Sequence, residues 1–436
     1  MSKKKIVAII LFFGIYFVIQ FLLGWAMKGN MYNSFGRATL HDLHTAEKIE
    51  NLMLGDSHLY AGLDVNTLSE LNNTTFLTAA TASQEVDGHL VILKETFKYH
   101  PELKRVFIDV DYLNNFQGDF KDRNHLRNIY TISDNLKDKK LKVNYLLKAT
   151  SPKYYLNHIL IFGKNRITGN PKDIIYTVKS LLTGEYWKYR KPVSGNQSYA
   201  GNGFIPCSTV PTDTIVKASE QIYFDKSGVS KDWYKFMQKI FEFCNRNNIE
   251  LCFIAVPESK FKIWDTINYT EYYNFINSYV TSNGFTYYDF NLSNNLELFR
   301  EDFYDDEHLN YPGAIKFTKC FNEFLNTEAL QRGNLFYTSL ENKKLSEPNT
   351  IAGFVTELSD DGKSITFKPV TNNENNIIEY TYKTEVNNTT NIVAEKTLVN
   401  SINLPLGSEG KINIQINLNN EYFCTFDYQF NTLWIK

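Results

Sequence analysis

The chain has 436 residues, of which 43% are hydrophobic, 22% charged and 15% aromatic, a globular composition that suits two or three domains. Its formal net charge of −2 argues against nucleic acid as a partner, because phosphate contacts require a basic face. The sequence has neither a phosphate-binding loop nor a dinucleotide fingerprint, so we expect no cofactor.

The first predicted element is a membrane-spanning helix. Three lysines precede an apolar run from Ile6 to Met27, longer than the roughly 20 residues that cross a bilayer core. Because basic residues stay on the cytoplasmic side, we expect residues 1–28 to form a single-pass anchor in the cell membrane, with the rest of the chain extracytoplasmic. A cleaved signal peptide is the alternative, and in both cases the main body is exported.

Short apolar strands then alternate with helices. Strands are predicted at residues 50–54, 76–81, 105–113, 250–257 and 285–290. Helices are predicted at residues 88–100 with Asp87 as the N-cap, at residues 233–248, and at residues 311–326 with Pro312 in the first turn. This alternation is typical of a parallel sheet covered by helices on both faces.

Two regions depart from the alternation. Residues 114–235 contain tyrosine-rich predicted helices followed by a loop-like half, and such an insertion either shapes a binding surface or forms a structural subdomain. After residue 335 helix signals are absent and short alternating segments predict a β-sandwich over residues 336–436. The α/β domain is therefore expected at residues 29–335, followed by a module that binds glycan or packs on the core.

Five scattered cysteines lack the spacing of a disulfide framework or a zinc site, and we expect mostly buried free thiols. His41 and His44 have a spacing that metals can use, but no third ligand is near, so a solvated helix face is expected and no metal is predicted. Asp109 and Asp111 alternate along the third predicted strand and could line the edge of a site.

Two short polar motifs stand at positions where open α/β sheets carry their sites. Gly-Asp-Ser-His at residues 55–58 directly follows the first strand, where a serine is often only a helix N-cap. Asp-Asp-Glu-His at residues 305–308 precedes the last helix of the α/β region. An Asp three residues before a His can place its carboxylate on Nδ1 and leave Nε2 as a base. Both motifs are expected at the C-terminal edge of the sheet, so they can meet.

Together the two motifs resemble those of the SGNH (GDSL-type) hydrolase superfamily. The resemblance implies a flavodoxin-like α/β fold in which Ser57 is the nucleophile, His308 the base and Asp305 its orienting carboxylate. Asp306 is the rival for the orienting role. His58 adjoins Ser57 in sequence, and its side chain is expected to diverge, so it is not assigned as the base.

The oxyanion hole is where the sequence departs from the family pattern. The superfamily usually supplies a Gly from its second block and an Asn from its third, and neither pattern is clean here. The backbone N–H of Ser57, together with a donor from Ser83 or Gln84 after the second strand, is the predicted replacement. Capping of the next helix is the alternative role for Ser83 and Gln84.

Three further blocks, at residues 79–111, 254–260 and 302–314, resemble an extracytoplasmic, membrane-anchored branch of the superfamily. That branch includes the alginate O-acetylation proteins and the D-alanyl transfer proteins of teichoic acid synthesis, which work with a membrane-bound O-acyltransferase as acyl donor. The resemblance covers roughly residues 48–330 in blocks. It implies a serine-dependent O-acyltransferase, foremost an O-acetyltransferase, that modifies a cell-surface or secreted polysaccharide through an acyl-serine intermediate. An esterase, D-alanyl transfer, and a non-catalytic glycan-binding assembly protein are the alternatives.

Overall fold

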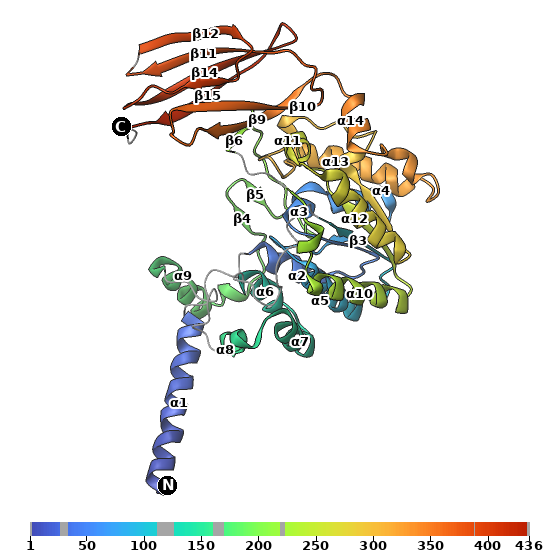
Figure 1. The fold of residues 1–436 in the computed structure, drawn as a ribbon. Helices are drawn as coiled ribbons and strands as arrows, with labels where there is room; N and C mark the ends of the chain where they lie inside the picture. The colour runs from blue at the N-terminus through green and yellow to red at the C-terminus, as the bar shows by residue number, and fades with distance from the viewer. Residues whose placement is uncertain are drawn as a thin grey trace.

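The computed structural model describes residues 2–26, 34–110, 126–159, 170–218, 223–387 and 389–433. Helix α1 (Lys3–Ala26) projects from one side of an α/β body, and the C-terminal strands form a separate β layer at the far end (Figure 1). Helix α1 is long and apolar enough to cross a membrane, and it is almost entirely exposed. A signal sequence near the N-terminus meets the same criterion, so sidedness remains a prediction.

The α/β body is built on five parallel strands. They are β1 (Asn51–Leu54), β2 (Phe76–Thr78), β3 (Arg105–Asp109), β7 (Glu250–Ala255) and β8 (Thr286–Asp289). Their order in the sheet is β2-β1-β3-β7-β8, which is the 2-1-3-4-5 order of a flavodoxin-like, doubly wound sheet. All five predicted strands are therefore confirmed, and the strand order reverses beside the end of β1, where such sheets carry their sites.

Helices cover both faces of the sheet. Successive side chains of a strand point to opposite faces, so each buried strand contributes to two cores. Leu52 and Leu54 join one core, and Met53 between them joins the other. The first core is covered by helices α2 (Phe35–Thr45), α5 (Val86–Tyr99), α10 (Lys231–Arg246) and α12 (Tyr269–Ser282). The second is covered mainly by α3 (Ser57–Gly62), α4 (Val65–Asn72) and α13 (Tyr311–Asn326).

Three details of the predictions are corrected or incomplete. Asp87 is not the N-cap of α5: Glu85 holds that position without a side-chain bond, and Asp87 is buried in the first turn. His44 does not lie on a solvated face, because its Nε2 lies 2.8 Å from the carboxylate of Glu95 in a buried pair. Asp109 is buried at the end of β3, where its Oδ1 accepts a hydrogen bond from the backbone N–H of Val256. Asp111 lies outside the described residues.

In the described part of the predicted insertion, helices come first and a largely loop-like stretch follows, as expected from its sequence. Its helices are α6 (Leu126–Ser133), α7 (Lys139–Ala149), α8 (Tyr155–Ile159) and α9 (Pro171–Leu182), and a hairpin of β4 (Val193–Ser194) and β5 (Gln197–Ser198) follows. Buried side chains of α6 and α7 extend the first core beside α5. The five cysteines are free, and four of them are buried, which confirms that expectation.

The C-terminal region forms two four-stranded sheets that enclose an aromatic core. One has the order β13-β10-β9-β6 and the other β12-β11-β14-β15. Their strands are β9 (Ile351–Leu358), β10 (Ser364–Thr371), β11 (Ile378–Val386), β12 (Thr389–Thr397), β13 (Ser401–Asn403), β14 (Glu409–Leu418) and β15 (Glu421–Asn431). Phe354 and Phe426 pack across the gap with ring centroids 4.9 Å apart. Val355 and Val370 reach the first core of the α/β body, so this module does pack on it.

Two features of this region escape the sequence pattern. A short helix, α14 (Leu340–Ser346), precedes β9, so the expectation of no helix after residue 335 is wrong. Strand β6 (Val216–Ala218) comes from the insertion and pairs with β9 in parallel, whereas the other neighbouring strands of the two sheets run antiparallel. The insertion therefore completes one sheet of the C-terminal module.

Gly55 joins β1 to α3 through a contact that leaves no space for a side chain. A Cβ at this position would lie 2.8 Å from the Cβ of Asp109 and 2.8 Å from Leu59. Gly55→Ala is therefore expected to lower the free energy of unfolding by about 1–3 kcal/mol, measured by urea denaturation. Gly333→Ala is the matched control, because a Cβ there meets nothing within 4 Å. Equal midpoints for the two variants would contradict this prediction.

Candidate active site

Ser57 stands at the carboxyl end of β1 as the first residue of α3. Asp56 is the N-cap of this helix, and its carboxylate accepts a hydrogen bond of 3.0 Å from the backbone N–H of His58. Ser57 is half-buried while its neighbours on both sides are buried. Because the first N–H groups of a helix have no intrahelical acceptor, the backbone N–H of Ser57 is not used by α3 itself.

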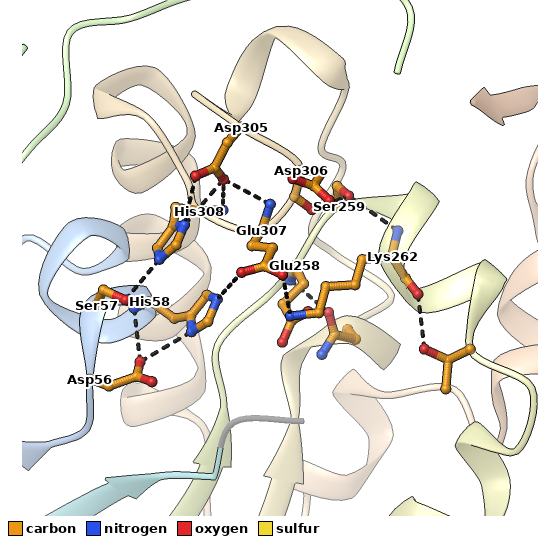
Figure 2. A network of polar contacts seen from close by, with 12 residues as sticks. Asp56, Ser57, His58, Glu258, Ser259, Lys262, Asp305, Asp306, Glu307 and His308 are labelled. Carbon is orange, nitrogen blue, oxygen red and sulfur yellow. Dashed lines mark hydrogen bonds and ion pairs between the residues drawn. The ribbon is translucent and has the colours of Figure 1, made fainter. Parts of the chain in front are cut away.

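The second motif reaches Ser57 from the loop before α13. Nε2 of His308 lies 2.8 Å from Oγ of Ser57, although 251 positions separate the two residues (Figure 2). Nδ1 of His308 lies 2.9 Å and 3.1 Å from the two carboxylate oxygens of Asp305. This carboxylate fixes the proton on Nδ1, so that Nε2 accepts the hydrogen bond from the Ser57 hydroxyl.

Asp305, and not Asp306, is the carboxylate on the imidazole. Oδ1 of Asp305 also accepts hydrogen bonds from the backbone N–H groups of Glu307 and His308, at 2.8 Å and 2.7 Å. Asp306 points the other way and pairs with Lys217 of β6. Burial alone would raise the pKa of Asp305, but the charge of His308 and these hydrogen bonds outweigh it and lower that pKa to about 2. The carboxylate is therefore ionised at neutral pH.

The loop that carries His308 is held from several sides. Nη1 of Arg300 donates a 2.9 Å hydrogen bond to the carbonyl of Asp305, and the Ser259 hydroxyl donates to the carbonyl of Asp306. After the loop, Asn310 caps α13 by accepting from the backbone N–H of Gly313. These contacts fix the position of His308.

The imidazole of His308 is enclosed between two other rings. The ring of His58 stacks on one side at 4.4 Å with an angle of 6°, and the ring of Tyr304 stacks at 5.1 Å with an angle of 17°. His58 is buried, and its Nδ1 lies 3.1 Å from Oδ1 of Asp56. The side chain of His58 thus diverges from Ser57, as expected, yet it shapes the site by holding the neighbouring imidazole.

A group of three charged side chains, two of them buried, lies beyond His58. Helix α11 (Lys260–Asp265) places Nζ of Lys262 2.9 Å from Glu258 and 3.2 Å from Glu307. The second oxygen of Glu307 lies 4.0 Å from Nε2 of His58 (Figure 2). Lys262 and Glu258 are 5% and 4% exposed, so this ion pair is sealed from solvent. Removing one partner of a buried ion pair leaves the other charge uncompensated, which strongly destabilises the fold.

Of the two predicted oxyanion donors after β2, the amide of Gln84 has other partners. Nε2 of Gln84 lies 3.1 Å from the carbonyl of Ala79 and 2.9 Å from Nδ1 of His89, so both amide hydrogens are engaged. Burial lowers the pKa of His89 to about 4, which keeps this ring neutral and able to accept. Ser83 is exposed with a φ of 49°, and its carbonyl accepts from Asn128. The backbone N–H of Ser57 remains the simplest candidate donor.

Comparisons with known proteins assign no family. A family model whose description gives no name matches residues 214–330, less than half of the chain. No curated protein matches. One solved structure, provisionally described as a platelet activating factor from Streptococcus pneumonia, is 11% identical, with a TM-score of 0.31 over 71% of this chain and 99% of that chain. A score this low carries no argument, so the superfamily resemblance stays a prediction.

The same residues offer one set of metal-binding atoms. Ligand atoms of His58, Glu307 and His308 lie within 4.8 Å of one another. The ammonium group of Lys262 already lies against Glu307, and a cation bound here would take His308 away from Ser57. The donor set therefore fits an acid–base site better than a metal centre.

Sequence reasoning found the chain of hydrogen bonds and missed what surrounds it. The stacking of His58 and Tyr304 on His308 depends on tertiary contacts, which no local sequence pattern predicts. The i,i+4 spacing of Glu258 and Lys262 was the one available signal for the buried ion pair. The arrangement can deprotonate a serine hydroxyl and hold the resulting imidazolium, which is the requirement for covalent acyl transfer.

Proposed function

We propose that this chain is an extracytoplasmic serine acyltransferase, foremost an O-acetyltransferase for a cell-surface or secreted polysaccharide. The observation that carries the proposal is the unbroken series of hydrogen bonds from Asp305 through His308 to Ser57. The apolar helix α1 supports a position at the membrane, where a membrane-bound O-acyltransferase would supply the acyl group. Ser57 is the nucleophile, His308 the base and Asp305 the orienting carboxylate.

In the first half of the reaction, Oγ of Ser57 attacks the acyl carbonyl while Nε2 of His308 takes its proton. The carboxylate of Asp305 stabilises the imidazolium that forms. The backbone N–H of Ser57 lies at the start of α3 and is the expected donor to the oxyanion. When the intermediate collapses, the bond to the donor breaks, the leaving group takes the proton from Nε2, and Ser57 carries the acyl ester.

In the second half, a sugar hydroxyl attacks the acyl-Ser57 carbonyl. His308 removes the hydroxyl proton and then returns it to Oγ as the ester bond to Ser57 breaks. The products are an O-acylated sugar and the free serine. The cycle thus needs a single base that acts twice, which suits an imidazole held rigidly by its neighbours.

An esterase of the same fold is the second candidate. The side chain of Asp305 is 40% exposed, so the site is open to water on this side. Water that reaches acyl-Ser57 before a sugar hydroxyl would release the free acid. The two functions share every residue named above and differ only in the acceptor.

The deciding experiment is to trap the acyl-enzyme. The full chain in detergent is incubated with p-nitrophenyl acetate, with and without an oligosaccharide acceptor, and acetyl-Ser57 is located by intact mass and peptide mapping. We expect an adduct that Ser57→Ala lacks and that sugar removes faster than water does. Release of acetate at the same rate with or without sugar would favour the esterase. No adduct and no turnover, with polymer acylation retained in cells carrying Ser57→Ala, would reject both and favour a glycan-binding role.

A further inference from the structure

The helical insertion presents an exposed surface that mixes aliphatic and basic side chains. On α9, residues 172, 175, 176, 179 and 182 are exposed and share one face of the helix, opposite the buried Thr177, Ser180 and Leu181. On α7, residues 140, 143, 147 and 148 are exposed opposite the buried Tyr145 and Leu146. We call the following set the basic apolar face: Lys140, Val143, Leu147, Lys148, Lys153, Leu156, Lys172, Ile175, Tyr176, Lys179 and Leu182.

The apolar side chains of this face are both grouped and highly exposed. Single exposed apolar residues are common on protein surfaces, but a group of them is not. Leu156 is 66% exposed, Ile175 69% and Leu182 73%. Grouped apolar side chains that face solvent mark a surface that contacts something else. Their interleaving with lysines, at helical spacing, is the pattern of helices that lie in a membrane interface.

The charge on these helices is predominantly positive. Residues 139–159 and 170–182 contain seven lysines and one acidic residue, Asp173. The positive field extends onto α5, where burial and then the charge of Lys148 lower the pKa of Lys94. Such a surface attracts an anionic one, and phospholipid headgroups are the anionic surface nearest to a membrane-tethered domain.

The position of the face in the molecule agrees with its chemistry. Helix α9 contacts α1, the apolar helix that can cross a membrane. Helices α7 and α8 lie on the side of the α/β body from which α1 projects (Figure 1). A bilayer that contains α1 therefore passes close to these helices.

We propose that the basic apolar face rests on the surface of an anionic bilayer when α1 is inserted. The aliphatic side chains enter the headgroup region while the lysines pair with lipid phosphates. The insertion then acts as a second membrane contact that fixes the height and tilt of the α/β body above the lipid. This role does not depend on the chemistry at Ser57.

The test places an environment-sensitive fluorophore on cysteines introduced as Leu156→Cys and Leu182→Cys, in the full chain with Cys424→Ser. The protein is reconstituted in nanodiscs of phosphatidylcholine with or without phosphatidylglycerol, and some lipids carry a nitroxide quencher. We expect a blue shift and quenching at both positions that strengthen with phosphatidylglycerol. A label at Leu345→Cys, which is on α14 and 78% exposed, is expected to stay in water.

Charge variants test whether lipid contact depends on the lysines of the basic apolar face or on the total positive charge of the protein. Neutralising Lys148, Lys172 and Lys179 with glutamine is expected to reverse most of the quenching, whereas the matched change at Lys363, Lys368 and Lys396 of the β module leaves it unchanged. The proposal is overturned if the labels stay in water in anionic nanodiscs. It is also overturned if the quenching is the same with and without phosphatidylglycerol. Labels that become shielded only when another membrane protein is added also overturn it and identify a protein partner instead.

Discussion

His308→Ala is expected to reduce the rate of Ser57 acylation on the order of 10⁴- to 10⁶-fold, which is the range for removing a base from a serine–histidine–carboxylate unit. The imidazole is the group within hydrogen-bond distance of the serine hydroxyl, at 2.8 Å, so the hydroxyl loses its base when the ring is removed. The measurement is the rate of adduct formation with p-nitrophenyl acetate, followed by mass. His58→Ala is the comparison, and a much smaller loss is expected, because its ring only packs on His308 and its nitrogens face carboxylates. A comparable loss in both variants would mean that the base has been misassigned.

The two neighbouring aspartates offer a sharper control on the same unit. Asp305→Asn is expected to lower the acylation rate by about 10⁴-fold, because the amide can favour the wrong tautomer of the imidazole. Asp306→Asn is expected to stay near the wild-type rate, because Asp306 pairs with Lys217 and not with the ring. Equal effects at the two positions would argue against Asp305 as the orienting residue.

The lowered pKa of Asp305 also predicts how stability depends on pH. Its pKa falls from 3.8 to about 2 in the folded protein, so the ionised carboxylate stabilises the fold above the unfolded value. That contribution is lost as the pH falls from about 4 to 2. The difference in thermal midpoint between the wild type and Asp305→Asn is therefore expected to be constant near neutral pH and to shrink through this window.

Lys262→Met is expected to lower the free energy of unfolding by about 3–5 kcal/mol, because it leaves buried Glu258 without its cation. Lys262 is 5% exposed and contacts both Glu258 and Glu307, so no water can replace its ammonium group fully. The measurement is urea denaturation of the full chain in detergent, followed by tryptophan fluorescence.

The double variant distinguishes charge from shape. Adding Glu258→Gln to Lys262→Met removes the unpaired carboxylate and is expected to restore a large part of the lost stability. Lys411→Met is the control for an ion pair of similar composition on the surface, and it is expected to leave the urea midpoint almost unchanged because exposed ion pairs contribute little to stability. If the double variant were no more stable than Lys262→Met, lost packing rather than lost charge would explain the result.

Sequence alone was sufficient for the parts of the molecule that local patterns determine. The strands of the parallel sheet are short apolar runs, and their alternation with helices predicted a parallel sheet covered on both faces, although not the order of its strands. Asp305 and His308 lie three residues apart, so their contact could be inferred from spacing. Their approach to Ser57 could be inferred because both motifs were assigned to the same edge of the sheet.

The rest depends on contacts between distant segments. Gln84 looked available as an oxyanion donor, and only the fold brings it against Ala79 and His89. Helix α14 is short and polar, and its N-cap, Ser339, was the single local sign of it. Strand β6 is three residues long and two of them are exposed, so neither periodicity nor burial distinguishes it from a loop.

Strand β6 links the C-terminal module to the loop that carries Asp305 and His308. Its backbone pairs with β9 at the edge of the sheet, and its Lys217 side chain forms an ion pair with Asp306, which lies in the same loop as His308. A truncation that stops at residue 335 would therefore remove β9, the strand that pairs with β6, and is expected to weaken the support of the loop that carries Asp305 and His308. The C-terminal module is therefore expected to support the loop that carries Asp305 and His308, although the ribosome synthesises the module after the loop.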